Sequence, residues 1–451
     1  MSLRAIELRA VEPMDQLSRL PFRVGRRRRK KQGTSPESCM YSRLWICGVS
    51  RVVLERPCNM RRMQLPDPII RSRKSLYFCL ALAATILCCF APASQAQRQD
   101  LPGLGDSPSD AGPLAKDLSP ALKKKDVAHA LRKVADWQLP RVEKNYSLDW
   151  TFAALYAGFM AVPPAVHGNT YQDAMRDMGK QFNWQLGPRP EHADDHAVGQ
   201  TYLELYEKSH DAAMLAPTRE RMDTLLQRTD DPAKPLWWWC DALFMAPPVL
   251  ADLSKITGDA KYLHFMDREW WITSKLLYDP QLHLYSRDAS FLDKKEANGA
   301  KVFWSRGNGW VMGGLVRVLS TMPANDPARQ QYVTQFQQMS QALAAIQGAD
   351  GLWRPGLLNA EAYKLPEVSG SAFITYAMAW GVRNGLLDRK QYLPVVEKAW
   401  KGLLTHVYQD GRLGCIQPIG AAPGAFTPTS SYVFGVGAFL MAGSEMYELS
   451  K

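Results

Sequence analysis

The sequence predicts an all-α protein whose main part is a single (α/α)6 barrel. Helical patterns fill the chain from about residue 127 to its end, and no second linker interrupts them. Two kinds of helix alternate along this stretch, one amphipathic and one rich in small residues. About 325 residues is large for one ordinary core but suits a single closed ring of helices.

The first kind of helix predicts the outer ring. Three stretches share one design, with a tyrosine in second position and a turn at the end: 261–279, 331–350 and 391–410. Their apolar residues recur at i, i+3, i+4 and i+7, which is typical of a helix buried on one side.

The second kind predicts the inner ring. Small residues let helices approach closely, and apolar character all round indicates burial. Six stretches qualify: 149–158, 196–206, 241–253, 308–319, 369–381 and 433–443. Charged and aromatic residues gather at their first positions, so we expect one rim of the barrel to collect them.

The N-terminal part predicts an export signal and not a fold. Residues 71–74 are basic, residues 76–90 are mostly apolar, and small residues lead to Ala96, as in a signal peptide with its cleavage site. The apolar run is short for a membrane span. We expect a periplasmic or extracellular protein that keeps no stable membrane association after processing. A genuine cytosolic extension with a membrane anchor is the alternative.

The predicted organisation has four parts. Residues 1–70 form a leader. The first residue of the protein is left open, since Met60 or Met63 is a more natural start. The signal peptide covers 71–96. Residues 97–125, rich in Pro, Gly, Ser and Asp, predict a flexible linker, and residues 126–451 form the barrel domain.

The charge of the chain argues against a nucleic-acid partner. The formal net charge is +11, but residues 1–96 hold 18 of the 55 Lys and Arg and 6 of the 44 Asp and Glu. The remainder carries a net charge of −1. Six of the eight cysteines also precede residue 97, leaving Cys240 and Cys415, so no disulfide framework or cysteine metal cluster is available. We expect no metal and no cofactor, and a monomer or weak homodimer.

Asp241 is the strongest catalytic candidate. Three tryptophans, 237–239, precede it, and apolar and small residues follow. Burial against aromatic rings raises the pKa of a carboxyl, which can then hold a proton near neutral pH and give it to a substrate. The alternative is a helix-capping Asp.

Two other rim segments carry polar side chains. Asp149 and Trp150 could offer a hydroxyl acceptor and a stacking face, or form a cap beside a core Trp. Asp194, Asp195 and His196 could orient water or share a proton, or provide a cap and a solvated charge. No His-Glu-x-x-His pattern accompanies them.

The segment 303–310 is the second strong signal. Trp304 could stack on a sugar ring, and Arg306 could bind a substrate carboxylate bidentately. The alternative is a Gly-rich turn with an incidental Arg.

Four segments together resemble glycoside hydrolase family 105, the unsaturated rhamnogalacturonyl hydrolases, and its relatives in family 88, the unsaturated glucuronyl hydrolases. They are 193–206, 239–248, 304–310 and 427–440. The resemblance implies an (α/α)6 barrel and a substrate oligosaccharide with a 4,5-unsaturated uronic acid at its non-reducing end, in this family from pectin-type rhamnogalacturonan. It implies hydration, in which an Asp protonates C4, water adds at C5, and the hemiketal opens to release the next sugar.

The resemblance also implies residue roles. Asp241 matches the proton donor. Substrate contacts are expected from Asp149, Trp150, Asp194, Asp195, His196, Lys234, Trp239, Arg287, Trp304 and Arg306. One departure concerns the loop at 284–288, where some members carry a His and this chain offers Arg287 or Asp288. Three alternatives stay open: activity on other unsaturated glucuronyl products, a non-catalytic sugar-binding barrel, and a conventional glycosidase.

Overall fold

A computed structural model describes residues 104–228 and 234–451 of the chain. The predicted leader, signal peptide and cleavage site, and the first residues of the predicted linker, lie outside the described residues.

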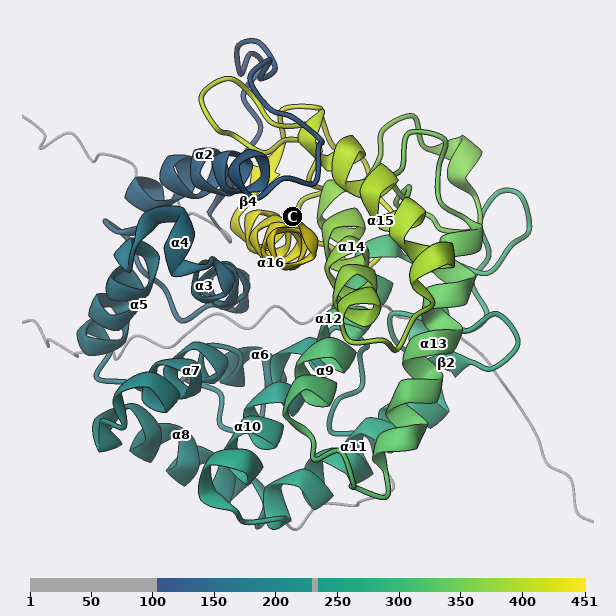
Figure 1. The fold of residues 1–451 in the computed structure, drawn as a ribbon. Coiled ribbons are helices and arrows are strands. Elements are labelled where there is room, and N and C mark those ends of the chain that lie inside the picture. The colour runs from purple at the N-terminus through teal and green to yellow at the C-terminus, as the bar shows by residue number, and fades with distance from the viewer. Residues whose placement is uncertain (1–103, 229–233) are drawn as a thin grey trace, which may run out of the picture. The chain divides into compact units, whose positions relative to one another are not determined.

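The described chain is a double ring of helices, which confirms the predicted fold (Figure 1). The outer ring consists of α2 (Lys124–Val142), α5 (Thr170–Gln181), α8 (Ala212–Leu225), α11 (Lys261–Leu277), α13 (Arg329–Ala345) and α15 (Arg389–Leu404). The inner ring consists of α3 (Trp150–Ala161), α7 (Gly199–Ser209), α10 (Pro247–Thr257), α12 (Ser305–Thr321), α14 (Val368–Arg383) and α16 (Val433–Leu449). Short helical turns α4 (Pro164–His167), α6 (Ala193–His196), α9 (Ala242–Met245), η1 (Ala289–Phe291) and η2 (Ala360–Ala362) join them.

Small residues close the inner ring. The last inner helix, α16, packs against the first, α3. A Cβ atom on Gly158 would lie 2.6 Å from Cα of Gly437, and one on Gly437 would lie 2.2 Å from the carbonyl oxygen of Ala154. Larger side chains would force the two backbones apart, so the glycines predicted for inner helices set the closure of the barrel.

The tyrosines that aligned the predicted outer helices are core residues. Tyr262 and Tyr332 are fully buried, and Tyr392 is 6% exposed. These three outer helices therefore turn the shared tyrosine inward, as their common design predicted.

Two predicted inner helices differ from expectation because each is broken near its start. The stretch predicted at 241–253 forms α9 and then α10, which restarts at Pro247. Proline lacks a backbone N–H and so suits the first position of a helix, not its interior. The stretch predicted at 196–206 likewise begins with the short α6 before α7. Because of these breaks, residues of both segments point toward the centre of the barrel rim.

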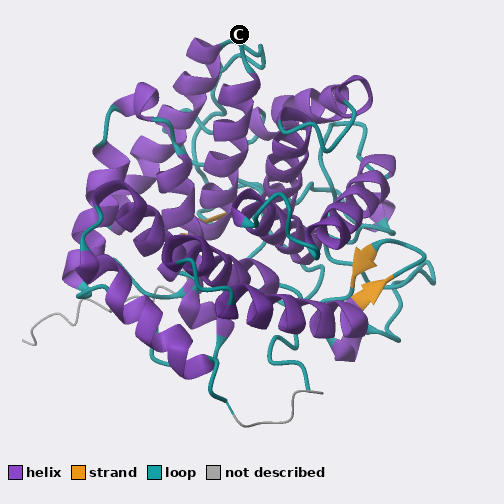
Figure 2. Cartoon of the chain, turned by 60° about the horizontal axis from the view of Figure 1, so that its bottom comes forward, coloured by secondary structure: helices purple, strands orange, loops and turns teal. Residues whose placement is uncertain are grey.

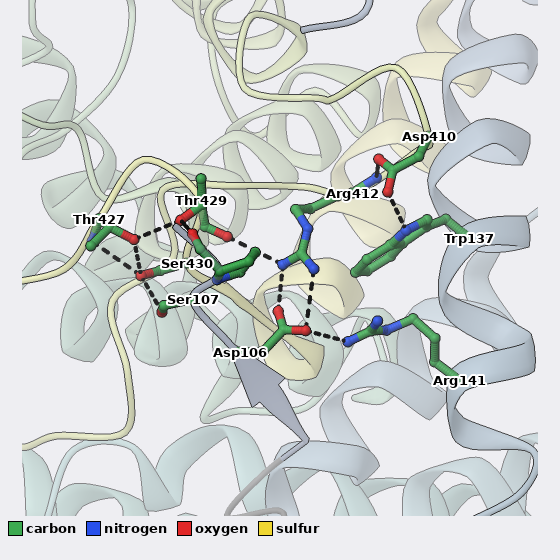
Figure 3. A network of polar contacts seen from close by, with 10 residues as sticks. Asp106, Ser107, Trp137, Arg141, Asp410, Arg412, Thr427, Thr429 and Ser430 are labelled. Atoms are coloured by element: carbon green, nitrogen blue, oxygen red, sulfur yellow. Dashed lines mark hydrogen bonds and ion pairs between the residues drawn. The ribbon is translucent and has the colours of Figure 1, made fainter. Parts of the chain in front are cut away.

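The described part of the predicted linker is anchored to the barrel, which corrects the expectation of flexibility there. Strand β1 (Gly105–Asp106) pairs antiparallel with β4 (Ser431–Tyr432). The Asp106 carboxylate accepts hydrogen bonds from Arg412 and from Arg141, the latter at 3.0 Å (Figure 3). From Leu104 onward these contacts hold the segment against the barrel, and we call it the strap.

Strands are a minor part of the described chain (Figure 2). A second two-stranded hairpin joins β2 (Tyr278–Asp279) to β3 (Leu284–Tyr285). Just after it, the backbone N–H of Cys240 donates to the carbonyl of Arg287 at 2.8 Å, and Trp239 bridges to Asp288. This pairing fixes Arg287 beside Asp241. Both cysteines of the described chain, Cys240 and Cys415, are buried free thiols. None of the described helices combines the length and apolar character that crossing a membrane requires.

Candidate active site

A cavity of about 130 Å³ opens at the rim where the inner helices begin. It is lined by Trp150, Asp194, Trp239, Asp241, Met245, Arg287, Trp304, Trp310, Ile419 and Gly420. These residues come from α3, α6, α9 and α12 and from the loops before α9, α12 and α16. The rim predicted to collect the polar side chains does so.

Asp241 is a buried carboxyl in the wall of this cavity. Its side chain makes no capping hydrogen bond, so the capping alternative does not hold. Oδ2 accepts a hydrogen bond from Nε of Arg287 at 3.2 Å, while Oδ1 is buried without a partner. Burial raises the pKa of Asp241 even though Arg287 and Arg306 lower it. Burial therefore favours the protonated form of this carboxyl.

Asp194 lines the cavity and Asp195 does not. Burial, followed by the charge of Asp241, raises the pKa of Asp194 to about 7. Asp195 instead accepts hydrogen bonds from Nε and Nη2 of Arg189, at 3.0 and 2.7 Å. Burial opposes ionisation of Asp195, but the bonds from Arg189 outweigh it and lower the pKa. The predicted pair thus divides into a cavity acid and an ion-paired structural residue.

Three other predicted contacts lie outside the cavity wall. His196 is fully buried, with Nε2 2.7 Å from the carbonyl oxygen of Pro190, and burial lowers its pKa to about 4. Asp149 caps α3, accepting the N–H of Thr151 at 2.9 Å, as its alternative reading held. Lys234 is exposed. The full burial of His196 corrects its expected substrate contact, because its side chain serves the fold. The expected contacts of Asp149 and Lys234 stay predictions, since both residues are exposed although neither lines the cavity.

Tryptophan side chains form much of the cavity wall. Trp150 stacks on Phe434 at 5.5 Å and meets Trp310 edge-on at 5.8 Å. Trp304 is 2% exposed and donates its indole N–H to Oε1 of Gln417 at 3.0 Å. These contacts fix the rings, so the cavity has a rigid aromatic surface suited to the C–H face of a sugar ring.

Arg287 is the cationic side chain among the residues that line the described cavity. It bonds to Asp241 and, through Nη1, to Asp288 at 2.8 Å. The guanidinium also lies over the ring of Trp238, 5.4 Å from its centroid. Its side chain is 20% exposed and so is accessible from the cavity.

Arg306 does not reach the cavity, which corrects its predicted role as the carboxylate-binding residue. It is fully buried and donates to the carbonyl oxygens of Gln417 and Pro418, both at 2.7 Å. Its guanidinium lies 4.2 Å from the centroid of Trp304 and 3.7 Å from Glu367 at the nearest atoms. Burial lowers its pKa to about 10, so it stays charged at neutral pH. Arg306 holds the loop before α16 against the rim.

Four lining residues carried no predicted role: Met245, Trp310, Ile419 and Gly420. Trp310 stands inside the 304–310 motif, and its position near the start of an inner helix could have drawn attention to it. Ile419 and Gly420 belong to a Pro- and Gly-rich loop that looks like any surface turn in sequence.

A larger hollow of about 670 Å³ lies on the outer ring between α11 and α13. Its lining contains no carboxyl group and no residue of the four family-like segments. We place the active site in the smaller cavity, because the buried acids gather there. The described residues contain no cluster of three or more His, Cys, Asp or Glu that could hold a metal ion.

A double ring of helices with an acid-bearing, tryptophan-lined cavity at one rim is suited to sugar chemistry. Comparison with known proteins identifies the class. The chain belongs to Glycosyl Hydrolase Family 88, whose model matches residues 124–450, and it is a glycoside hydrolase.

Named relatives agree with this membership. "Unsaturated 3S-rhamnoglycuronyl hydrolase" of Formosa agariphila is 40% identical over 351 residues, covering 73% of this chain and 93% of the relative. A protein of the same name from Alteromonas sp. (strain LOR) is 33% identical, covering 68% and 79%. The solved structure "Glycosyl hydrolase family 88 from Bacteroides vulgatus" is 32% identical with a TM-score of 0.69, covering 72% of this chain and 99% of that one.

Proposed function

We propose that this enzyme removes a 4,5-unsaturated uronic acid from the non-reducing end of rhamnose-containing oligosaccharides, by hydration of the C4=C5 double bond. The names of the two relatives described above support an unsaturated rhamnoglycuronyl substrate. Pectin-type rhamnogalacturonan fragments and other rhamnose-linked uronides share this chemistry.

The observation that carries the proposal is the Asp241 carboxyl. A hydration acid must be protonated when substrate arrives and must point an oxygen at the double bond. Asp241 combines a raised pKa with an unpartnered Oδ1 in the wall of the cavity. We assign its proton to C4.

The rest of the reaction balances without a further reagent. After C4 accepts the proton, positive charge develops at C5 and the ring oxygen. Water adds to C5, and its proton passes to the carboxyl pair of Asp194 and Asp241, which restores the acid. The C5 hemiketal opens to a ketone and leaves a hemiacetal at C1. Collapse of that hemiacetal to an aldehyde releases the next sugar as an alcohol.

We assign the uronate carboxylate to Arg287. The substrate is an anion, and a bidentate guanidinium is the usual partner for a carboxylate. When Arg287 turns toward the substrate, it gives up part of its contact with Asp241, which favours the protonated acid. Binding of the uronate anion and protonation of Asp241 are then linked.

Loss of double-bond absorbance tests the function. Purified protein is mixed with an unsaturated uronyl-rhamnose disaccharide made by lyase digestion, and absorbance and released rhamnose are followed together. The proposal expects both to change at the same rate. A sugar-binding barrel gives neither change, and a conventional glycosidase releases sugar while the absorbance of the intact double bond persists.

We further propose that the mature protein begins near Gln97, is exported, and acts as a monomer or weak homodimer. The support is the basic, apolar and small-residue pattern of 71–96. N-terminal sequencing and light scattering of the secreted protein test this. A cytosolic protein that retains residues 1–96 would contradict it.

A further inference from the structure

Two large apolar side chains stand exposed at the mouth of the cavity. Four large hydrophobic residues of the described chain are strongly exposed, and Trp238 and Ile419, at 48% and 47%, are two of them. Ile419 lines the cavity directly. Trp238 touches two lining residues, with its ring 4.7 Å from that of Trp239 and 5.4 Å from the guanidinium of Arg287. Single exposed apolar residues are ordinary, but two beside one site are not.

The neighbouring tryptophans show that the exposure of Trp238 is specific. Trp237 is fully buried and Trp239 is 4% exposed. The segment is held by the bridge from Trp239 to Asp288, so the ring of Trp238 is left outside while its neighbours enter the core and the cavity wall. Leaving an indole half in water forgoes part of the stabilisation that its burial would bring.

Ile419 is held in place from behind. Arg306 binds the carbonyl oxygens of Gln417 and Pro418, and the Gln417 side chain donates to the carbonyl of Ala422 at 2.8 Å. Gln417 also receives the indole N–H of Trp304. The backbone on either side of Ile419 is therefore fixed, although its side chain faces outward. An apolar side chain on a braced loop is a preorganised contact, not a loose turn.

We propose that Trp238 and Ile419 form the subsite for the sugar that is released, and that this subsite selects a 6-deoxyhexose. The inference rests on the proposed function, because it needs the unsaturated uronate to occupy the inner cavity. That cavity, at about 130 Å³, has little room beyond a single sugar ring, so the next sugar extends to the mouth. The indole face of Trp238 stacks on the C–H face of that sugar. Ile419 contacts the methyl group that distinguishes a 6-deoxyhexose from a hexose.

The magnitude of the expected selectivity between a 6-deoxyhexose and a hexose follows from the contact that Ile419 makes. Placing a hydroxyl where a methyl group contacts an apolar side chain typically costs a factor of roughly 10 to 200 in kcat/KM. Stacking acts on either sugar, since a hexose and its 6-deoxy form present the same ring. Trp238 therefore contributes to affinity and Ile419 to discrimination.

Three substrates separate these contributions. Each carries the same unsaturated uronate, attached to L-rhamnose, to L-mannose, or to a methyl group. L-mannose differs from L-rhamnose by a hydroxyl at C6, and the methyl glycoside leaves the mouth empty. Wild-type enzyme is expected to prefer rhamnose over mannose by about 10-fold or more.

Matched variants then assign each side chain. Ile419→Ser is expected to bring the rhamnose-to-mannose ratio close to one, while Ile419→Val keeps it. Trp238→Ala is expected to raise KM about 10-fold for both disaccharides, and Trp238→Phe less. Each variant should lower kcat/KM less for the methyl glycoside than for the rhamnose disaccharide, because the methyl glycoside places no sugar at the mouth.

The outcomes separate the two proposals. If wild-type enzyme leaves all three substrates intact, the proposed function fails. If it hydrolyses them with a ratio near one, or if Ile419→Ser leaves the ratio unchanged, the deoxy-sugar subsite is wrong. If Trp238→Ala slows the methyl glycoside equally, Trp238 acts by holding Arg287, and its place in the subsite is refuted.

Discussion

Nε of Arg287 lies 3.2 Å from Oδ2 of Asp241, and these two residues are 46 positions apart in the chain. The contact exists because the strand-like segment before α9 pairs with the segment after β3. It places the cavity's cation against the acid that we assign to proton transfer. The raised pKa of Asp241 is therefore a balance between burial, which raises it, and Arg287, which lowers it.

Replacing Arg287 should change binding and pH dependence together. Arg287→Gln removes a charge-assisted contact worth about 1.5–3 kcal/mol, so KM for unsaturated uronides is expected to rise roughly 10- to 100-fold. The loss of the cation also raises the pKa of Asp241, so the alkaline limb of the kcat profile should move to higher pH. Kinetics from pH 4 to 9 measure both effects. Arg268→Gln is the control, since Arg268 is half-exposed on α11 and pairs with Glu269. An unchanged KM and profile in Arg287→Gln would exclude the assignment.

Asp241→Asn should abolish chemistry while leaving the barrel intact. The amide keeps the size of the side chain but delivers no proton, and a positioned acid contributes about 10²–10⁴-fold. Turnover is expected to fall by that factor, with the melting temperature little changed because the amide occupies the same buried position as the protonated carboxyl. Asp252→Asn is a matched control, since burial raises the pKa of Asp252 to about 7 at a site away from the cavity. If Asp241→Asn remained fully active, Asp194 would become the candidate acid.

Asp194 and Asp195 should affect stability in opposite directions. The pKa of Asp194 rises from 3.8 to about 7 in the folded protein, so the folded state binds the extra proton between these pH values. The unfolding free energy then falls as pH rises through this window, by up to roughly 4 kcal/mol. Asp194→Asn removes this penalty and should stabilise the protein at pH 8 more than at pH 5.

Asp195 provides the reverse case on the same segment. Its pKa is lowered by Arg189, so its stabilising effect is present above the unfolded pKa and is lost as pH falls through the folded one. Asp195→Asn is expected to destabilise the protein at pH 7. Urea unfolding at pH 5, 7 and 8 measures both variants. Identical pH dependence in the two variants would contradict the division of this pair.

The sequence predicted the fold and the burial of Asp241 because both depend on local pattern. Alternating helix types reveal the two rings, and a lone carboxyl after three tryptophans indicates burial. The breaks at α6 and α9 were not predicted, although the two prolines at 247–248 favour the start of a new helix there. The strap was not predicted either, because a Pro- and Gly-rich segment looks flexible until its partners, Arg141 and Arg412, are known.

The positions of the arginines could not be read from sequence, because each depends on a distant partner. Arg306 stands 111 residues before the carbonyl of Gln417 that it binds. The glycines and aromatic residues around Arg306 in the sequence are compatible with a side chain that faces the rim. They are equally compatible with a buried side chain that stabilises a loop. Arg287 was one of two options for a variable loop position, and only the pairing with the segment before Asp241 brings it to the cavity.

Arg306→Lys tests whether this residue braces a loop or binds the uronate. The planar guanidinium makes two fixed bonds to the loop before α16, which an ammonium cannot reproduce. The buried charge beside Glu367 is kept, so the barrel should still fold. We expect a lower melting temperature and a higher KM, since the loop carries Ile419.

A substrate with its uronate methyl-esterified separates the two roles of these arginines. The methyl ester is close in size to the free acid but carries no negative charge, so wild-type enzyme should prefer the free acid. Arg306→Lys is expected to retain that preference, because the residue acts through the loop and not on the charge. Arg287→Gln is expected to lose most of it, because the cavity then has no cation for the carboxylate. The measurement is the ratio of kcat/KM for acid and ester in each variant. If Arg306→Lys lost the preference and Arg287→Gln kept it, Arg306 would be the carboxylate-binding residue after all, reached by a movement of the loop at 417–420.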